Sequence, residues 1–140
     1  MTLRGIADNL NSLDRQDRIE ALISIADRFQ AVPTEVASRP FDEGARVPGC
    51  ESEAFIWVMD QPDGSLKYYF AVENPQGISA KALASILDEA LPEMSLSEIA
   101  SLSDDIVFEI FGNELSMGKT MGLTGMINMV RSAANRRAAK

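Results

Sequence analysis

The chain has 140 residues, 46% of them hydrophobic, and its 21 acidic and 13 basic side chains give a formal net charge of -8. This length can bury one sizeable core, so we expect a single domain over residues 1–140. The acidity argues against nucleic acid as a partner, and the chain has no histidine for a catalytic triad or an imidazole-ligated metal site. We therefore expect neither a conventional hydrolase nor a resident metal ion.

The N-terminal segment and the cysteine content bear on the compartment. Residues 1–13 lack the continuous apolar stretch of a signal peptide, and no later run is long enough to span a bilayer. Cys50 is the single cysteine, so it cannot form an intramolecular disulfide. We expect a cytoplasmic protein without membrane association, in which Cys50 is a free thiol.

Two helices and a long loop are expected before Cys50. A short helix is expected over Thr2–Leu10, and helical spacing of apolar residues behind a capping aspartate predicts a second over Asp14–Gln30. Ala31–Gly49 contains three prolines and two glycines and has no periodic apolar face, which predicts a long ordered loop. Loops of this length in compact domains usually have a function. The apolar face expected for the second helix comprises Ile19, Leu22, Ile23, Ala26 and Phe29.

Two strands are expected after Cys50. Ala54–Met59 is an unbroken apolar run, and Leu66–Val72 alternates apolar with more polar residues, so both segments are predicted to be strands. The intervening Gln61–Ser65 contains proline followed by glycine, which predicts a tight turn and an antiparallel hairpin. An isolated hairpin is only marginally stable, so we expect helices to cover it.

The remainder of the chain is predicted to be helical. An apolar stripe predicts a helix over residues 79–91 that Pro92 stops. Ser95 and Glu98 have the spacing of a capping box, which predicts a short helix, and a further helix is expected to end at Gly112.

The last helix is expected over Lys119–Ala138, where Gly122 and Gly125 would allow another backbone to approach closely. The predicted fold class is therefore α+β, with a small antiparallel β-sheet packed against several helices. We expect helices around Ile86 and Met126 to cover the hairpin.

Cys50 is the strong nucleophile of the chain, and its position distinguishes it from most structural cysteines. It follows a proline–glycine pair and lies outside any apolar period, whereas a structural cysteine commonly belongs to an apolar face. Many lone cysteines are inert, so the position by itself leaves both a reactive and a structural role open. The neighbouring Glu51 and Glu53 oppose thiolate formation and Arg46 favours it, which argues against a self-activated peroxidase-type thiol.

The segment Arg46-Val47-Pro48-Gly49-Cys50-Glu51-Ser52, followed by an apolar strand, resembles the cysteine loop of the SufE family. The order of predicted elements is similar over nearly the whole chain, and Leu115–Leu123 resembles the family's segment before its last helix. The resemblance implies a SufE/IscU-like fold with a third short strand, which we expect near Arg46.

The same resemblance implies a sulfur acceptor. Persulfide sulfur would pass to Cys50 from a pyridoxal-phosphate-dependent, SufS-like cysteine desulfurase, whose activity the protein would enhance, and would continue to an iron–sulfur cluster scaffold. Such a protein needs no cofactor of its own and acts as the partner of the desulfurase rather than as an autonomous enzyme. The implied site consists of Cys50 as the catalytic residue and of Arg46, Gly49, Ser52 and Lys119 as binding residues. A single cysteine suits a carrier, because a second one could resolve the persulfide into a disulfide.

Two positions depart from the family pattern and keep alternatives open. Gly118-Lys119-Thr120 stands where the family usually has Ser-Arg-Ser, and Glu73 or Asn74 stands where it commonly has aspartate. One alternative is an interaction module that docks on a desulfurase and stimulates it without carrying sulfur. Another is a thiol redox sensor, which the acidic neighbours and the missing resolving cysteine disfavour. We also expect the sulfur of Cys50 to be mostly buried in the free protein, since cellular thiols would reduce an exposed persulfide.

Overall fold

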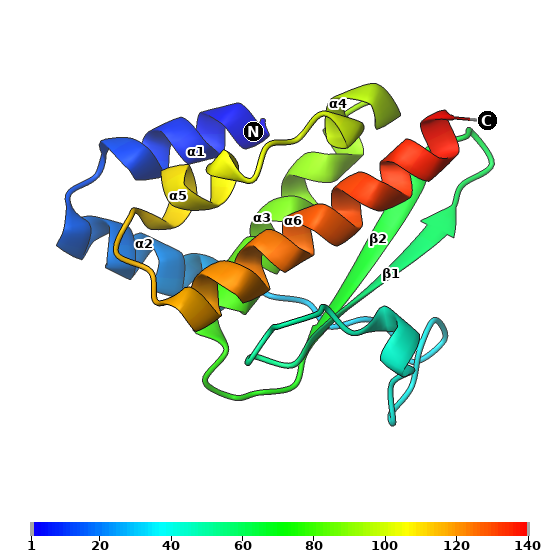
Figure 1. Cartoon of the computed structure of the whole chain (residues 1–140), viewed down its shortest axis with the longest axis horizontal. Helices are drawn as coiled ribbons and strands as arrows, with labels where there is room; N and C mark the ends of the chain where they lie inside the picture. Colours follow the sequence, from blue (N-terminus) through cyan, green and yellow to red (C-terminus); the bar gives the residue numbers. More distant parts are fainter. Residues whose placement is uncertain (1, 140) are drawn as a thin grey trace.

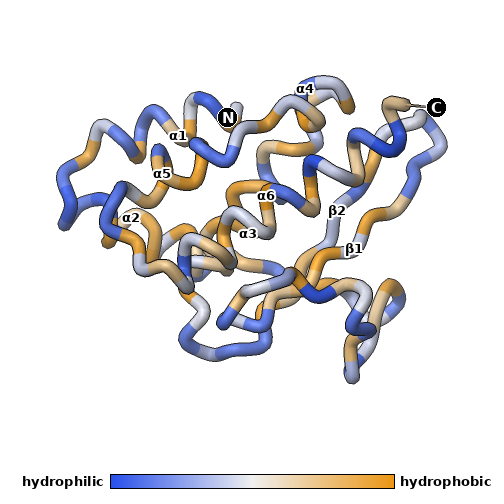
Figure 2. Tube along the Cα trace, in the orientation of Figure 1, coloured by the Kyte–Doolittle hydropathy of each residue, from blue (hydrophilic) through white to orange (hydrophobic). Residues whose placement is uncertain are grey.

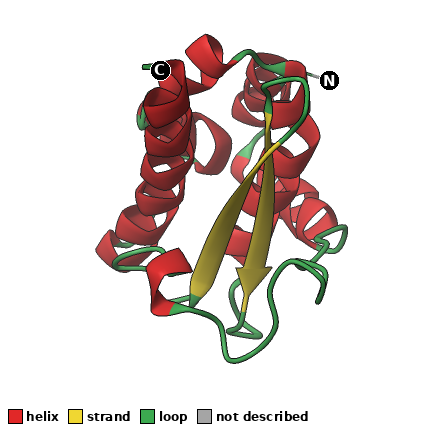
Figure 3. Ribbon diagram, turned by 90° about the vertical axis from the view of Figure 1, so that its right-hand side faces the viewer, coloured by secondary structure: helices red, strands yellow, loops and turns green. Residues whose placement is uncertain are grey.

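The computed structural model describes residues 2–139 and confirms the α+β class. Within these residues, helices pack on one side of a two-stranded antiparallel sheet (Figures 1 and 3). None of the described helices is long and apolar enough to cross a bilayer. The elements are α1 (Leu3–Ser12), α2 (Arg15–Ala26), β1 (Ala54–Asp60), β2 (Leu66–Val72), α3 (Ile78–Ala90), α4 (Leu96–Ala100), α5 (Asp105–Phe111) and α6 (Met117–Ala138).

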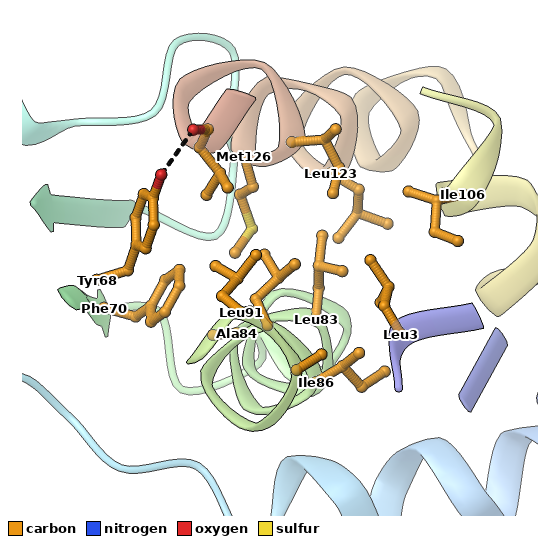
Figure 4. Close-up of a cluster of buried hydrophobic side chains, with 14 of the residues drawn as sticks. Leu3, Tyr68, Phe70, Leu83, Ala84, Ile86, Leu91, Ile106, Leu123 and Met126 are labelled. Carbon is orange, nitrogen blue, oxygen red and sulfur yellow. Dashed lines mark hydrogen bonds between the residues drawn. The ribbon is translucent and has the colours of Figure 1, made fainter. Parts of the chain in front are cut away.

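The core is built on α3 and α6. Helix α3 packs against α1, α2, α6 and β2, and its Leu83 and Leu87 are completely buried. Figure 4 shows side chains of α3 meeting Met126 of α6, with Tyr68 of β2 at the sheet end of the cluster. Hydrophilic positions are concentrated in the turns, including the one between β1 and β2 (Figure 2). The expectation that helices around Ile86 and Met126 cover the hairpin is confirmed.

The hairpin is antiparallel as predicted and buries both faces. The strands pair from Ala54 opposite Val72 to Asp60 opposite Leu66. Tyr68 and Phe70 on one face join the main core, whereas side chains on the other face form a second cluster with the long loop. The loop therefore covers the outer face, as α3 and α6 cover the inner face. The second cluster consists of Val32, Ala45, Phe55 and Ala71, with Val36, Ala37, Phe41, Trp57 and Tyr69 packed around it.

The long loop also pairs with the edges of the hairpin. The Val32 amide donates to the Phe70 carbonyl at 2.8 Å on the β2 side, and the Val47 amide donates to the Ala54 carbonyl at 2.9 Å on the β1 side. Arg46 forms an isolated antiparallel bridge with Phe55. The third strand expected near Arg46 is thus reduced to a single bridge, because the chain turns away at the proline–glycine pair that follows.

Helix α2 begins as predicted, ends at Ala26 before the predicted Gln30, and buries only part of the predicted face. The Asp14 carboxylate accepts a hydrogen bond from the Asp17 amide at 2.9 Å and caps the first turn. Ala26 is buried and Leu22 and Phe29 pack against the core, as expected of the predicted apolar face. Ile19 and Ile23 are exposed, so including them in that face was wrong. The helix packs one side against α3, and the strip with Ile19 and Ile23 lies outside that contact.

Helix α6 begins two residues before the predicted start. The hydroxyl of Ser116 accepts a hydrogen bond from the Lys119 amide at 3.2 Å and caps the helix. Glycine has a low helix propensity, so Gly118 concealed the first turn in the sequence pattern. The capping box of Ser95 and Glu98 and the end of α5 at Gly112, which has φ of 87°, are confirmed.

One buried hydrogen bond joins the sheet to α6. The Tyr68 hydroxyl donates to the Val130 carbonyl at 2.9 Å, and burial raises the pKa of Tyr68 to about 12. Tyr68→Phe is expected to lower the free energy of unfolding by about 1 kcal/mol, because the buried hydrogen bond between β2 and α6 is lost. Chemical denaturation would measure the loss. Tyr69→Phe, on the other face of β2, is the control, and an equal effect of the two changes would contradict the expectation.

Candidate functional site

Cys50 lies between two consecutive tight turns. The first is closed by the Cys50 amide donating to the Val47 carbonyl at 3.4 Å, with Gly49 at a φ of 71° in the position that requires positive φ. The second is closed by the Glu53 amide donating to the Cys50 carbonyl at 3.2 Å. Glu53 itself has a φ of 54°, an uncommon conformation for a residue other than glycine. The backbone therefore presents Cys50 at the apex of a compact loop.

Three glycines of α6 form the surface on which this loop rests. A Cβ atom on Gly122 would lie 3.1 Å from the Cys50 Sγ and 3.2 Å from its Cα. On Gly125 it would lie 2.9 Å from Val47 Cγ1, and on Gly118 it would lie 2.6 Å from the Glu51 Oε1. Figure 1 shows the loop passing beneath the N-terminal half of α6. A side chain at Gly122 or Gly125 would meet the backbone of Cys50 or Pro48 and push the cysteine loop away from the helix, whereas one at Gly118 would meet only the carboxylate of Glu51.

The glycine contact half-buries Cys50 and leaves it at the edge of a small cleft. The cleft has a volume of about 280 Å³ and lies between the cysteine loop, the start of α3 and the first turns of α6. The packing against Gly122 agrees with the expectation of a sheltered sulfur, although the residue is not completely enclosed. The polar side chains at the cleft come from Glu51, Ser52, Asn74, Gln76, Ser79 and Lys119.

Asn74 fastens the cysteine loop to the segment after β2. Its side-chain amide donates to the Glu51 carbonyl at 3.3 Å, and its backbone amide donates to the Ser52 carbonyl at 3.1 Å. Glu73 instead pairs with Arg39 at 2.8 and 3.0 Å outside the cleft, and this hydrogen bonding lowers the pKa of the Glu73 carboxyl. Of the two candidates at this position, Asn74 is the residue that lines the cleft.

The structure brings some of the predicted site residues together and separates another from them. Cys50, Ser52 and Lys119 line one cleft, and Gly49 forms the turn before it. Arg46 lies outside this lining, where its guanidinium bonds the Glu43 carboxylate at 2.7 and 3.1 Å and covers the Phe55 ring at 4.7 Å. The hydrogen bond to Glu43 raises the pKa of Arg46. Arg46 therefore braces the base of the loop and does not contribute to the cleft.

Sequence reasoning missed several groups at this site. The Glu51 carboxylate lies beside Gly118 in the first turn of α6, where the helix dipole favours a negative charge. Exposed apolar side chains also occur here: Ile78 lines the cleft, and Met121, 54% exposed, lies beside Gly49. The spacing of the glycines at 118, 122 and 125 was the available signal for the loop's resting surface.

Asn74→Ala is expected to loosen the cysteine loop, because it removes the amide donor to Glu51 and the acceptor for the Gln76 amide, which is 2.9 Å away. Hydrogen exchange at the Glu53 amide, which closes the second turn, should quicken several-fold, with little change in global stability. Glu73→Gln is the matched control outside the cleft. Unchanged exchange in Asn74→Ala would show that the backbone bonds alone hold the loop.

Comparisons with known proteins place this geometry in a family. The family model described as "SufE: Fe-S metabolism associated domain" matches residues 4–134. The fold is similar to the solution structure of a hypothetical protein from Thermus thermophilus, with a TM-score of 0.74, 21% identity and coverage of 100% of both chains. No curated protein matches the chain at a significant level.

The match extends over nearly the whole chain and includes the cysteine loop, the hairpin and most of α6. The similarity to the Thermus thermophilus structure supports the fold over the full length. The chain belongs to the SufE family, whose domain is associated with iron–sulfur metabolism.

Proposed function

We propose that Cys50 accepts sulfane sulfur from the persulfide of a pyridoxal-phosphate-dependent, SufS-like cysteine desulfurase and passes it toward an iron–sulfur cluster scaffold. The observation that carries the proposal is the position of Cys50 at the apex of two tight turns, half-buried against Gly122 at the edge of a cleft. Family membership supplies the metabolic context. The reducing cytoplasm is the compartment that suits a lone thiol.

The transfer needs only one sulfur on this chain. The Cys50 thiolate attacks the terminal sulfur of the donor persulfide, a new S–S bond forms on Cys50, and the S–S bond of the donor breaks. The donor cysteine leaves as a thiolate and takes up the proton that Cys50 lost, so no external oxidant or reductant is required. The second step repeats this displacement with a thiol of the acceptor as the nucleophile.

Positive charge at the cleft supports this displacement. Lys119 is exposed and lines the same cleft as Cys50, and the N-terminus of α6 adds the positive end of its dipole. Both stabilise the attacking thiolate and the thiolate that leaves. The Glu51 carboxylate offsets part of this charge in the free protein. Activation of Cys50 is therefore expected to depend on docking to the desulfurase.

The contact with α6 protects the persulfide between the two steps. One side of Cys50 is closed by the Gly122 backbone, and Asn74 keeps the following turn in place. Small cellular thiols then reach the sulfane sulfur from the cleft side only. The exposed Ile78 at the cleft and Met121 beside Gly49 offer apolar surface for the desulfurase to cover.

Mass spectrometry tests the proposal directly. The protein is incubated with a SufS-like cysteine desulfurase and L-cysteine, and both the intact mass and the peptide containing Cys50 are measured. The expected result is a gain of one sulfur atom on that peptide, which dithiothreitol removes. A reaction without L-cysteine is the control. No gain in mass under turnover conditions would overturn the proposed carriage of sulfur.

A further inference from the structure

A second cleft lies next to the one that contains Cys50. It has a volume of about 430 Å³ and is lined by α2, the end of α5, the connection to α6 and the first turn of α6. Ser79 and Lys119 line both clefts, so the two are continuous on the surface. Figure 1 shows the start of α6 lying close to α2. A segment bound in the second cleft would thus lie beside the approach to Cys50.

The charge in this cleft is opposite to that of the whole chain. Its lining includes Arg15, Arg18 and Lys119 but a single acidic residue, Glu114, whereas the chain has 21 acidic and 13 basic side chains. The N-termini of α2 and α6 both lie at the cleft and add positive potential. The local excess of positive charge attracts carboxylates.

The two arginine side chains of the cleft differ in how firmly the structure holds them. Arg18 donates to the carbonyls of Leu10 at 3.0 Å and Leu13 at 3.3 Å, so it fixes the end of α1 and forms a rigid wall. Arg15 bonds Glu114 at 3.0 Å, but both side chains are more than two-thirds exposed. An exposed ion pair of this kind is weak and exchanges its partner readily. Arg15 is therefore available to an incoming carboxylate.

Apolar side chains complete the cleft. Leu22, Phe111 and Leu115 line its interior, and Ile19 lies at its rim with 42% of its surface exposed. This strip of α2 is the one that the core leaves uncovered. A bound segment that places one apolar side chain there would bury Ile19.

We infer that this cleft binds an acidic segment of the desulfurase, with an apolar side chain against Ile19 and Phe111 and a carboxylate against Arg15. The inference rests on the proposed function for the identity of the partner. The charge of the cleft selects an acidic segment, and its continuity with the Cys50 cleft selects the protein that brings the persulfide. Docking here would hold the donor while its persulfide enters the neighbouring cleft.

The test measures affinity for a SufS-like cysteine desulfurase by isothermal titration calorimetry with the full-length protein. Arg15→Glu is expected to weaken binding by about tenfold and to reduce the salt dependence of the affinity. Arg136→Glu makes the same charge change in the last turn of α6 and should bind as the wild type does. Equal affinities of Arg15→Glu and Arg136→Glu would overturn the inference.

Two exposed isoleucines of α2 give an independent check of the proposed binding. Ile19→Asp should weaken binding by about tenfold, whereas Ile23→Asp, with 43% exposure against 42% for Ile19, changes a residue outside the cleft lining and should not. Circular dichroism melts verify that each variant is folded. If Ile19→Asp instead dissociates a dimer seen by sedimentation, the cleft binds a second copy and the inference is wrong. Sulfur uptake by the wild type tests Cys50 separately, so the two proposals can fail independently.

Discussion

Cys50→Ser is expected to abolish sulfur uptake from a desulfurase while the protein remains folded. A hydroxyl cannot hold sulfane sulfur, and the chain contains no other thiol to replace Cys50. Serine fits the space beside Gly122, so the free energy of unfolding should fall by no more than about 1 kcal/mol. Intact mass after incubation with the desulfurase and L-cysteine measures the first effect, and thermal denaturation measures the second. A sulfur adduct on Cys50→Ser would refute the assignment.

The rate of desulfurase turnover distinguishes a sulfur carrier from an interaction module that stimulates the desulfurase without carrying sulfur. If Cys50→Ala accelerates cysteine turnover as well as the wild type does, stimulation arises from docking and the module interpretation is correct. If Cys50→Ala does not accelerate cysteine turnover, the acceptance of sulfur by Cys50 is the step that stimulates the desulfurase. Peroxide titration addresses the redox sensor, since rapid formation of a sulfenic acid at neutral pH would support that alternative.

Gly122→Leu is expected to displace the cysteine loop from α6. Its Cβ atom would lie 3.1 to 3.3 Å from three atoms of Cys50, and the remaining carbons would add to this crowding. Overpacking costs about 1–3 kcal/mol, and the better helix propensity of leucine returns about 1 kcal/mol, so a net loss of about 0–2 kcal/mol is expected. The displaced loop should expose the thiol.

Alkylation by iodoacetamide measures that exposure. We expect the Cys50 reaction in Gly122→Leu to be about tenfold faster, which corresponds to about 1.4 kcal/mol of lost loop docking. Asn135→Leu, at an exposed position near the other end of α6, controls for the added side chain. If Gly122→Leu had the alkylation rate and the stability of the wild type, the position of the cysteine loop would not depend on the glycines of α6.

Local signals predicted the elements well and the site only in part. Caps such as Asp14 and the Ser95–Glu98 pair act within one turn, so the sequence reveals them. The same holds for the hairpin, whose turn residues specify their own conformation. The long loop was correctly predicted, but its role as the cover of the outer face depends on Val32 and Phe41 meeting residues far along the chain. The spacing of apolar residues along the sequence does not predict contacts between segments that are far apart in the chain.

Arg46 shows why residues adjacent in sequence can be separated in a site. It was expected to bring positive charge to Cys50; in the structure it forms an ion pair with Glu43 and lies outside the lining of the Cys50 cleft. Conversely, Asn74 and Gly122 lie at Cys50 although the chain separates them widely. The glycines of α6 were expected to allow close approach, and the structure adds that the approaching backbone is the cysteine loop itself.

The pairing of the long loop with the hairpin edges has a consequence for aggregation. Exposed strand edges invite other chains to add strands, and proteins suppress this by covering them. Here Val32 covers part of one edge and Val47 part of the other. Displacement of residues 48–53 alone would leave the bond from Val47 to Ala54 in place and keep that edge closed. Displacement that included Val47 would free part of the β1 edge for intermolecular strand addition, so the bond from Val47 protects the protein from self-association.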